Sequence, residues 1–416
     1  MNTPLHLSKI LGFKVSRKDP GYSYRSIGAS GENKASVYYG VYTAGKKSLK
    51  YMVVIKRGTP AEKEAPKPGN RGKRDSQLIM MGMLNRVHYD RRPCELDEVM
   101  INALNKLEIP PTEIEYMMAI DADTRVSKLS MSYMHRYMQA NDRVLACCGE
   151  TKVDNTTASW VTMIQIYDYF ASHALKKSFE SIFGCVTCLP GCFTMLRIYC
   201  PDDMRPLLSS DNVFQAYSRN DIESLHDKNL FHLGEDRMLT TLLLKYFPEY
   251  RLNFVPAASC WTIVPDSYKV LLSQRRRWIN STFHNMWELL KVRTLCGCCC
   301  LSMKTVVAID MLSTMILPAA FLYGLSFIYV VFVAGEPITQ LTLILFGVIL
   351  GAQVLIFLVR SRIDHLFWFL FYLVVGLPVF FFVLPLYSFW NMDDLSWGTT
   401  RQVAESKKPA SASSPK

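Results

Sequence analysis

Two pairs of carboxylates in this sequence have the types and spacing needed for chemistry on a phosphorylated substrate. The first pair, Asp121 and Asp123, flanks one alanine directly after the apolar run 116–120. Carboxylates at the end of a buried strand can hold a hard divalent cation, Mg²⁺ or Mn²⁺, that bridges a nucleotide diphosphate. Surface turns often contain the same pattern, so by itself the pair is weak evidence for a metal site.

The second pair is Glu235 and Asp236, in the string GEDR at 234–237, which opens an expected helix over 238–247. Acidic residues at a helix start are commonly caps. The functional alternative is a general base at the mouth of a cleft, with Arg237 keeping its neighbours paired. The candidates for such a base are Asp236 and Glu235.

A basic string with one indole, QRRRW at 274–278, follows. Its arginines can anchor a helix at a membrane surface. They can also clamp a leaving diphosphate while Trp278 stacks on a sugar. Upstream, LPGCF at 189–193 leads into an apolar stretch over 194–198 and is, taken alone, a tight turn before a strand.

An α/β scaffold is expected to position these motifs. Residues 51–55 and 116–120 are short apolar runs typical of buried strands, and 160–183 has a helical pattern. We therefore predict an α/β fold, with a cytosolic domain over 1–265 and amphipathic interfacial helices over 266–304. The tail 402–416 has the low-complexity composition of a disordered segment.

Three charge-poor runs follow that domain, at 311–334, 338–359 and 366–390. Each is long enough to cross a hydrocarbon core, which takes about 20 helical residues. We predict about three transmembrane helices within 305–390. Pro378 and Pro385 can instead break the last run into a re-entrant or hairpin element, which would change the side on which 391–401 lies.

Loop charges indicate the orientation. Lysines and arginines flank the first two runs on one side, whereas the loop between those runs carries only Glu336. The positive-inside rule then places residues 1–304 in the cytosol. The glycosylation sequons at Asn155 and Asn280 would be out of reach there.

The net charge is +11, and residues 56–92 alone carry ten Lys/Arg against four Asp/Glu. In a membrane protein this charge favours anionic lipid or a diphosphate substrate over nucleic acid. The 12 cysteines do not indicate a disulfide framework in a cytosolic domain. A zinc site at Cys185, Cys188 and Cys192 is disfavoured, because no second CxxC accompanies it. The cysteines at 296 and 298–300 are either palmitoylation sites or packing residues at the membrane edge.

The motifs in this order, followed by membrane runs, resemble the processive glycosyltransferases of family 2. Longer strings narrow the resemblance to the chitin synthases of the large fungal classes, and it extends over about residues 36–401. These strings are PGNRGKRDSQ (68–77), CGETK (148–152), FESIFGCVTCLPGCF (179–193), HLGEDRMLTTLLLKYFP (232–248), VLLSQRRRWINSTFHN (270–285) and FWNMDDLSWGTTR (389–401).

The resemblance implies roles for individual positions. Asp123 matches a metal-coordinating carboxylate, Asp121 its donor-binding companion and Asp236 the general base. Lys73, Arg74 and Arg277 match residues that bind the donor or its diphosphate. Gln274, Trp278 and Trp397 match residues that bind the acceptor or product. Trp397 lies in SWGTTR, which carries one threonine more than the family motif.

The resemblance also implies a glycosyltransferase A-type, Rossmann-like domain with a Mg²⁺ or Mn²⁺ cofactor. The expected reaction transfers N-acetylglucosamine from UDP-N-acetylglucosamine to a chitin chain. The plasma membrane is the expected location, with secretory vesicles as a second one. The resemblance is also compatible with a homo-oligomer of this protein. The uracil-binding strands of such domains are expected upstream of this sequence. The alternatives are therefore a truncated, non-catalytic membrane subunit, or another family 2 polysaccharide synthase.

Overall fold

The structure, a computed structural model, describes residues 3–16, 19–28, 31–62, 64, 67–298, 301–335, 337–359 and 364–396. The chain divides into two compact units: one of residues 1–122 and 195–222, the other of residues 123–194 and 223–416. Trp397, the rest of the SWGTTR string after Ser396 and the tail 402–416 lie outside the described residues.

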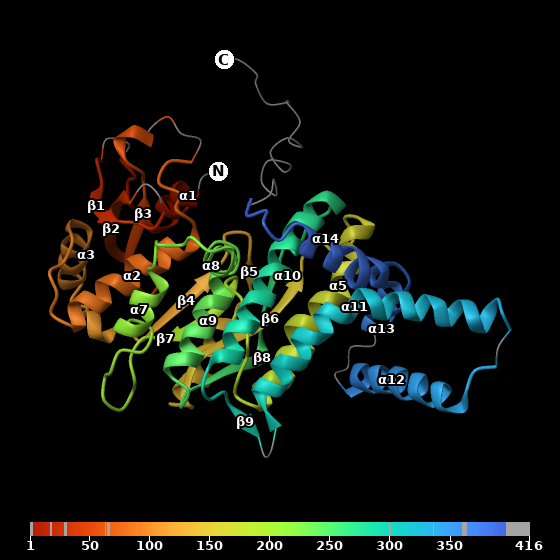
Figure 1. The fold of residues 1–416 in the computed structure, drawn as a ribbon. Helices are drawn as coiled ribbons and strands as arrows, with labels where there is room; N and C mark the ends of the chain where they lie inside the picture. Colours follow the sequence, from red (N-terminus) through yellow and green to blue (C-terminus); the bar gives the residue numbers. More distant parts are fainter. Residues whose placement is uncertain are drawn as a thin grey trace. The chain divides into compact units, whose positions relative to one another are not determined.

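The first unit combines a small antiparallel sheet with helices that bury apolar side chains. The sheet order is β1-β2-β3 (Figure 1). The strand expected over 51–55 is confirmed within β3, although its residues are only half-buried. The bounds in this unit are α1 Thr3–Leu11, β1 Tyr22–Arg25, β2 Glu32–Ala44, β3 Lys47–Lys56, α2 Gly72–His88, α3 Glu95–Lys106, β4 Tyr116–Ile120 and α7 Asp211–Tyr217.

Strand β4 confirms the strand predicted over 116–120. It pairs with β7 (Phe193–Arg197), most of which belongs to the same unit. Beyond β7, the Ile198 N–H donates to the Glu115 carbonyl at 2.9 Å. Because Asp121 follows the last residue of β4, its carboxylate stands at the carboxyl end of a strand, as expected.

The second unit is built on β6 (Val144–Val153) and β8 (Arg251–Thr262), which run parallel, with β5 (Arg125–Val126) antiparallel to β8. Strand β6 is buried along most of its length, as expected of a strand covered on both faces. Helices α4 (Ser130–Gln139), α5 (Trp160–Phe170) and α6 (Lys176–Ile182) pack against these strands.

Helices then follow one another to the membrane region. A short π-helical turn, η3 (Ala171–Leu175), joins α5 to α6, so the helical segment predicted over 160–183 is confirmed. Helix α8 spans Leu225–Phe231, and α9 (Glu235–Tyr246) begins three residues before the predicted start. The interval 266–304 holds one long helix, α10 (Tyr268–Lys291), and a small hairpin of β9 (Gly297–Cys298) and β10 (Leu301–Ser302), instead of several helices.

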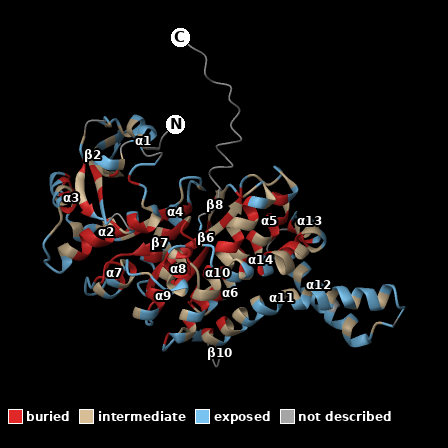
Figure 2. Cartoon of the chain, turned by 45° about the horizontal axis from the view of Figure 1, so that its top comes forward, coloured by how far each residue is buried: buried red, intermediate tan, exposed pale blue. Residues whose placement is uncertain are grey.

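Two helices, α11 (Met303–Phe332) and α12 (Gln340–Val359), are long and apolar enough to cross a membrane. Their side chains are largely exposed (Figure 2), which a lipid environment explains. The third apolar run forms two helical halves, 364–376 and 378–390, bent by 52° at the break before Pro378. The described helices therefore give two spans, or three if the bent pair is one span. The bent pair consists of α13 Asp364–Phe371, η4 Tyr372–Gly376, η5 Pro378–Val383 and α14 Leu384–Trp390.

The bent pair packs against the α/β part of the second unit. Val379 and Leu384 join Val161 and Ile164 of α5 and Leu271 of α10 in one buried apolar cluster. Phe371, Val375 and Phe380 pack around its edge. The bend before Pro378, which the sequence allowed as an alternative to a third crossing, thus lets one apolar segment cover two helices.

Candidate active site

The carboxylate at the end of β4 has a basic partner in the first unit. Asp121 Oδ1 lies 2.5 Å from Nζ of Lys73, and both side chains are partly exposed. Lys73 stands in the first turn of α2, after Gly72, whose φ of +78° lies in the left-handed region that glycine favours. Two of the residues predicted to bind the donor are therefore in contact.

Arg74, the third predicted donor-binding residue, is buried. Its Nη2 donates to the carbonyl of Arg219 at 2.9 Å, and its guanidinium carbon lies 6.0 Å from the ring centroid of Tyr217. These contacts tie α2 to α7. They give Arg74 a role in folding, and its role in donor binding stays a prediction.

Asp123 lies in the exposed turn that follows Asp121. In the second unit its charge acts on the buried phenol of Tyr169, whose pKa is raised mainly by burial and in smaller part by Asp123. Among the described residues no three His, Cys, Asp or Glu side chains are grouped to hold a metal. An exposed carboxylate still fits Mg²⁺, because this ion usually takes one or two carboxylates and completes its shell with substrate phosphates and water.

The carboxylate of Asp236 is held by the LPGC loop. The Gly191 N–H donates to Asp236 Oδ2 at 3.0 Å. A Cβ at residue 191 would collide with both carboxylate oxygens, so only glycine permits this approach. Thr240 links the same two segments: its hydroxyl donates to the Asp236 carbonyl and accepts from the Leu189 N–H, at 2.8 and 3.1 Å.

The start of α9 also lies against α10. A Cβ at Gly234 would come within 2.5 Å of Cβ of Ser281, so glycine is needed there as well. Arg277 stands one turn earlier on α10 and is buried. Burial lowers the pKa of its guanidinium, and the negative charge of Glu235 raises it. The charge of Glu235 therefore acts on Arg277, and the carboxylate of Asp236 accepts from the Gly191 N–H.

All three arginines of QRRRW are buried, which excludes the reading of this string as a simple anchor at the lipid surface. Arg275 Nη2 lies 2.7 Å from Asp168 Oδ2 of α5. Arg276 forms an ion pair with Asp394 and donates to the Ser396 carbonyl at 2.8 Å. The α10 helix thereby fixes the chain just before the SWGTTR string.

Trp278 and Gln274, the predicted acceptor-binding residues, stand on the same helix. Trp278 is half-buried and packs, with Trp368, against a cluster that includes Ile166 and Tyr169. The Oε1 atom of Gln274 is buried and has no hydrogen-bond partner among the described residues. An amide in this state favours a site that a polar ligand completes.

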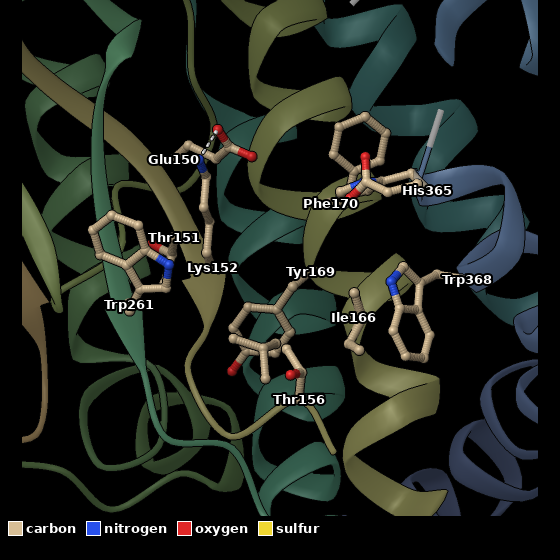
Figure 3. Close-up of a pocket in the computed structure, with 12 residues that line it drawn as sticks. Glu150, Thr151, Lys152, Thr156, Ile166, Tyr169, Phe170, Trp261, His365 and Trp368 are labelled. Carbon is tan, nitrogen blue, oxygen red and sulfur yellow. Dashed lines mark hydrogen bonds and ion pairs between the residues drawn. The ribbon is translucent and has the colours of Figure 1, made fainter. Parts of the chain in front are cut away.

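Next to this cluster the second unit has a half-open cavity of about 160 Å³. Figure 3 shows Trp261, Tyr169 and Trp368 around it, with Glu150 and Lys152 forming an ion pair of 3.4 Å at one side. Aromatic faces beside a few polar groups suit a sugar ring. His365 and Trp368 come from α13, so the bent apolar segment supplies part of the wall.

The sequence reasoning missed the partners of the motif residues. Asp168, Gly191 in its contact with Asp236, and Asp394 all lie far along the chain from the groups they hold. Of these residues, Gly191 lies within LPGCF and Asp394 lies two residues before the SWGTTR string. No spacing rule connects Asp168 with Arg275.

Comparison with known proteins gives one consistent family. A family model described as chitin synthase matches residues 1–415. The chain is 45% identical to chitin synthase Vb of Fusarium oxysporum f. sp. lycopersici over 97% of its length and 23% of the relative's. It is 47% identical to chitin synthase 5 of Cryptococcus neoformans var. grubii (97% and 21%). It is 45% identical to chitin synthase 6 of Mycosarcoma maydis (98% and 34%).

These matches extend the resemblance. The family model begins at residue 1, so the match reaches further than the interval 36–401 deduced from the longer strings. The chain spans about a fifth to a third of the length of these relatives. The matches are therefore evidence about the matched part of each relative only.

Proposed function

Because the chain belongs to the chitin synthase family, we propose that it carries the transferase site of a chitin synthase. The proposed reaction moves N-acetylglucosamine from UDP-N-acetylglucosamine to the non-reducing end of a growing β-1,4-linked chain, with inversion at the anomeric carbon. The observation that carries the proposal is the position of the GEDR turn, between the LPGC loop and the QRRRW helix.

In this proposal Asp236 is the general base. The Gly191 N–H fixes one carboxylate oxygen at 3.0 Å, so the carboxylate is oriented before the acceptor arrives. It takes the proton of the acceptor C4 hydroxyl as that oxygen attacks the anomeric carbon. General-base assistance of this kind is typically worth about 10²–10⁴-fold in rate.

Arg277 and the strand-end residues act on the leaving group. The buried guanidinium of Arg277 favours negative charge on a departing UDP, because a charge in a dry site interacts more strongly than one in water. Lys73, beside Asp121, is a second cation for the donor. Asp123, with Asp121 as companion, would hold a Mg²⁺ or Mn²⁺ ion, whose charge would offset that of the diphosphate.

The acceptor side of the proposal rests on Gln274, Trp278 and the neighbouring cavity. The indole of Trp278 offers a face to a sugar ring. Residues of α13 in the bent segment line part of the cavity. This position suits a polymer that leaves the site toward the membrane. Passage of chitin across the bilayer by this segment with α11 and α12 is part of the same proposal.

We place the α/β part on the cytosolic side of the plasma membrane, from the charge bias around the first two apolar runs. The bent pair contacts α5 and α10 at both halves, so it favours a re-entrant arrangement with two crossings, α11 and α12. Residues 391–396 would then lie on the same side as α10.

The test uses the full-length protein in membranes supplied with labelled UDP-N-acetylglucosamine. We expect release of UDP and an insoluble product that chitinase digests to chitobiose. A polymer resistant to chitinase would indicate another family 2 synthase. Expression without UDP release, rescued by adding a second complete synthase, would indicate a non-catalytic subunit.

A further inference from the structure

Arg275 forms the centre of a contact between three segments of the second unit. Its Nη2 atom lies 2.7 Å from Asp168 Oδ2. Its guanidinium carbon lies 4.6 Å from the ring centroid of Trp278, 5.6 Å from Tyr169 and 5.2 Å from Phe380. One cation therefore touches α5, α10 and the bent apolar segment at once.

The closest of these rings belongs to Trp278, the residue proposed to stack on the acceptor. A planar guanidinium can lie over a ring face, which a compact ammonium cannot do in the same way. The Asp168 carboxylate of α5 forms an ion pair with Nη2 at 2.7 Å, although the two atoms are not aligned as a hydrogen bond. This ion pair holds the guanidinium beside the indole of Trp278.

The burial of this pair is not explained by folding alone. The Arg275 side chain is 9% exposed and that of Asp168 is 17% exposed. The Nε and Nη2 atoms of Arg275 and the Oδ2 atom of Asp168 are buried without a hydrogen-bond partner among the described residues. Taking two charges out of water costs more than such a pair usually returns, and apolar residues of similar size are often as stable or more so. A functional role for the Arg275–Asp168 pair would account for its presence.

We propose that Arg275, oriented by Asp168, is a positioning residue that sets the orientation of the Trp278 indole for the acceptor sugar. Through Phe380 the same guanidinium joins that indole to the bent apolar segment. This inference rests on the proposed function and extends it to two residues that no motif role covers. Neither residue needs to touch the substrate.

The first variant is Arg275→Lys, which keeps a cation near Asp168 and removes the planar stack. We measure UDP release, polymer formed per UDP released, mean chain length and the KM for UDP-N-acetylglucosamine. We expect insoluble polymer per UDP to fall at least about tenfold, because the transferred sugar then ends in short soluble chains or, with water as the acceptor, as free N-acetylglucosamine. The donor KM should stay within about twofold. The matched control is Arg86→Lys, which makes the same change in another ion pair, Arg86 with Asp97 in the first unit.

A double-mutant cycle with Trp278→Phe, which keeps a smaller ring and should leave polymer to measure, decides whether Arg275 acts through the indole. We expect Arg275→Lys to cause no further loss once the indole is replaced by a phenyl ring. Losses that multiply would overturn the proposal, because they would show that Arg275 acts independently of Trp278. An Arg275→Lys variant with wild-type polymer per UDP and chain length would overturn it as well.

A folding defect is separated by the double variant Arg275→Met with Asp168→Leu, which removes both charges and keeps comparable volume. We expect this variant to insert and melt like the wild type and yet to show the same loss of polymer per UDP. If it restores polymer to the wild-type amount, the pair is structural and the inference fails. Failure of the wild-type protein to make any polymer would instead refute the proposed function itself.

Discussion

The Gly191 N–H donates to a carboxylate oxygen of Asp236 at 3.0 Å, across 45 residues of chain. The missing side chain at 191 is what permits the contact, since a Cβ would collide with both oxygens. The LPGC loop and the GEDR turn, two strings that seem unrelated along the sequence, therefore form one feature. The loop holds the carboxylate and α9 carries it.

Gly191→Ala should displace Asp236 and lower turnover by at least about 10²-fold, which is the scale of a lost general base. UDP-sugar binding should change much less, since Asp121, Asp123 and Lys73 are not in this loop. Gly324→Ala is the matched control, because a Cβ there has nothing within 4 Å. Normal turnover by the Gly191 variant would mean that the loop does not orient the base.

Asp236→Asn keeps the shape of the side chain, and the amide oxygen can still accept from the Gly191 N–H. If Asp236 were only a helix cap, the change would cost at most about 1 kcal/mol of stability and spare turnover. As the base, it should lower UDP release and polymer yield by about 10²–10⁴-fold. Turnover near normal would move the base to Glu235, although Glu235 already balances Arg277.

Arg277→Ala and Trp278→Ala should each abolish polymer formation without preventing membrane insertion. The arginine offsets charge on the leaving diphosphate, and one such group is typically worth about 10²–10³-fold. Both residues precede α11, so insertion should not depend on them. Alkaline extraction and protease protection check insertion; degraded or soluble variants would reduce QRRRW to a structural element.

Removal of divalent cations should stop UDP release by the full-length protein. Asp121 and Asp123 would repel a diphosphate, and a Mg²⁺ or Mn²⁺ ion at Asp123 relieves that repulsion. Chelation with EDTA followed by return of either ion is the measurement. Activity that persists unchanged in EDTA would contradict a metal at this site.

Two crossings should leave the loop after α11 and the segment after α14 on opposite faces of the membrane. In intact spheroplasts a membrane-impermeant maleimide should label Pro337→Cys, whereas Asn391→Cys should react only after permeabilisation. Labelling of both from outside would indicate three crossings. The native sequons cannot serve this purpose, because Asn280 is fully buried and the Asn155 amide bonds to the Val264 backbone at 2.8 and 2.9 Å.

The sequence by itself determined the features that depend on neighbouring residues. Strand β4, helix α9 and the three apolar runs follow from local periodicity and length, and the family follows from the order of short strings. A break at Pro378 was one of two arrangements that the sequence allowed, because proline removes a helical hydrogen bond. Proline alone did not decide it, since Pro318 lies inside the single helix α11. The pairs Asp121/Asp123 and Glu235/Asp236 were also evident, although their roles were not.

Only the tertiary structure decided which groups meet. The sequence could not tell Glu235 from Asp236, and the difference comes from their partners, Arg277 and Gly191. It also could not pair Arg275 with Asp168, which stands on another helix. Such contacts depend on how helices pack over β6 and β8, because packing brings together side chains that no local pattern relates.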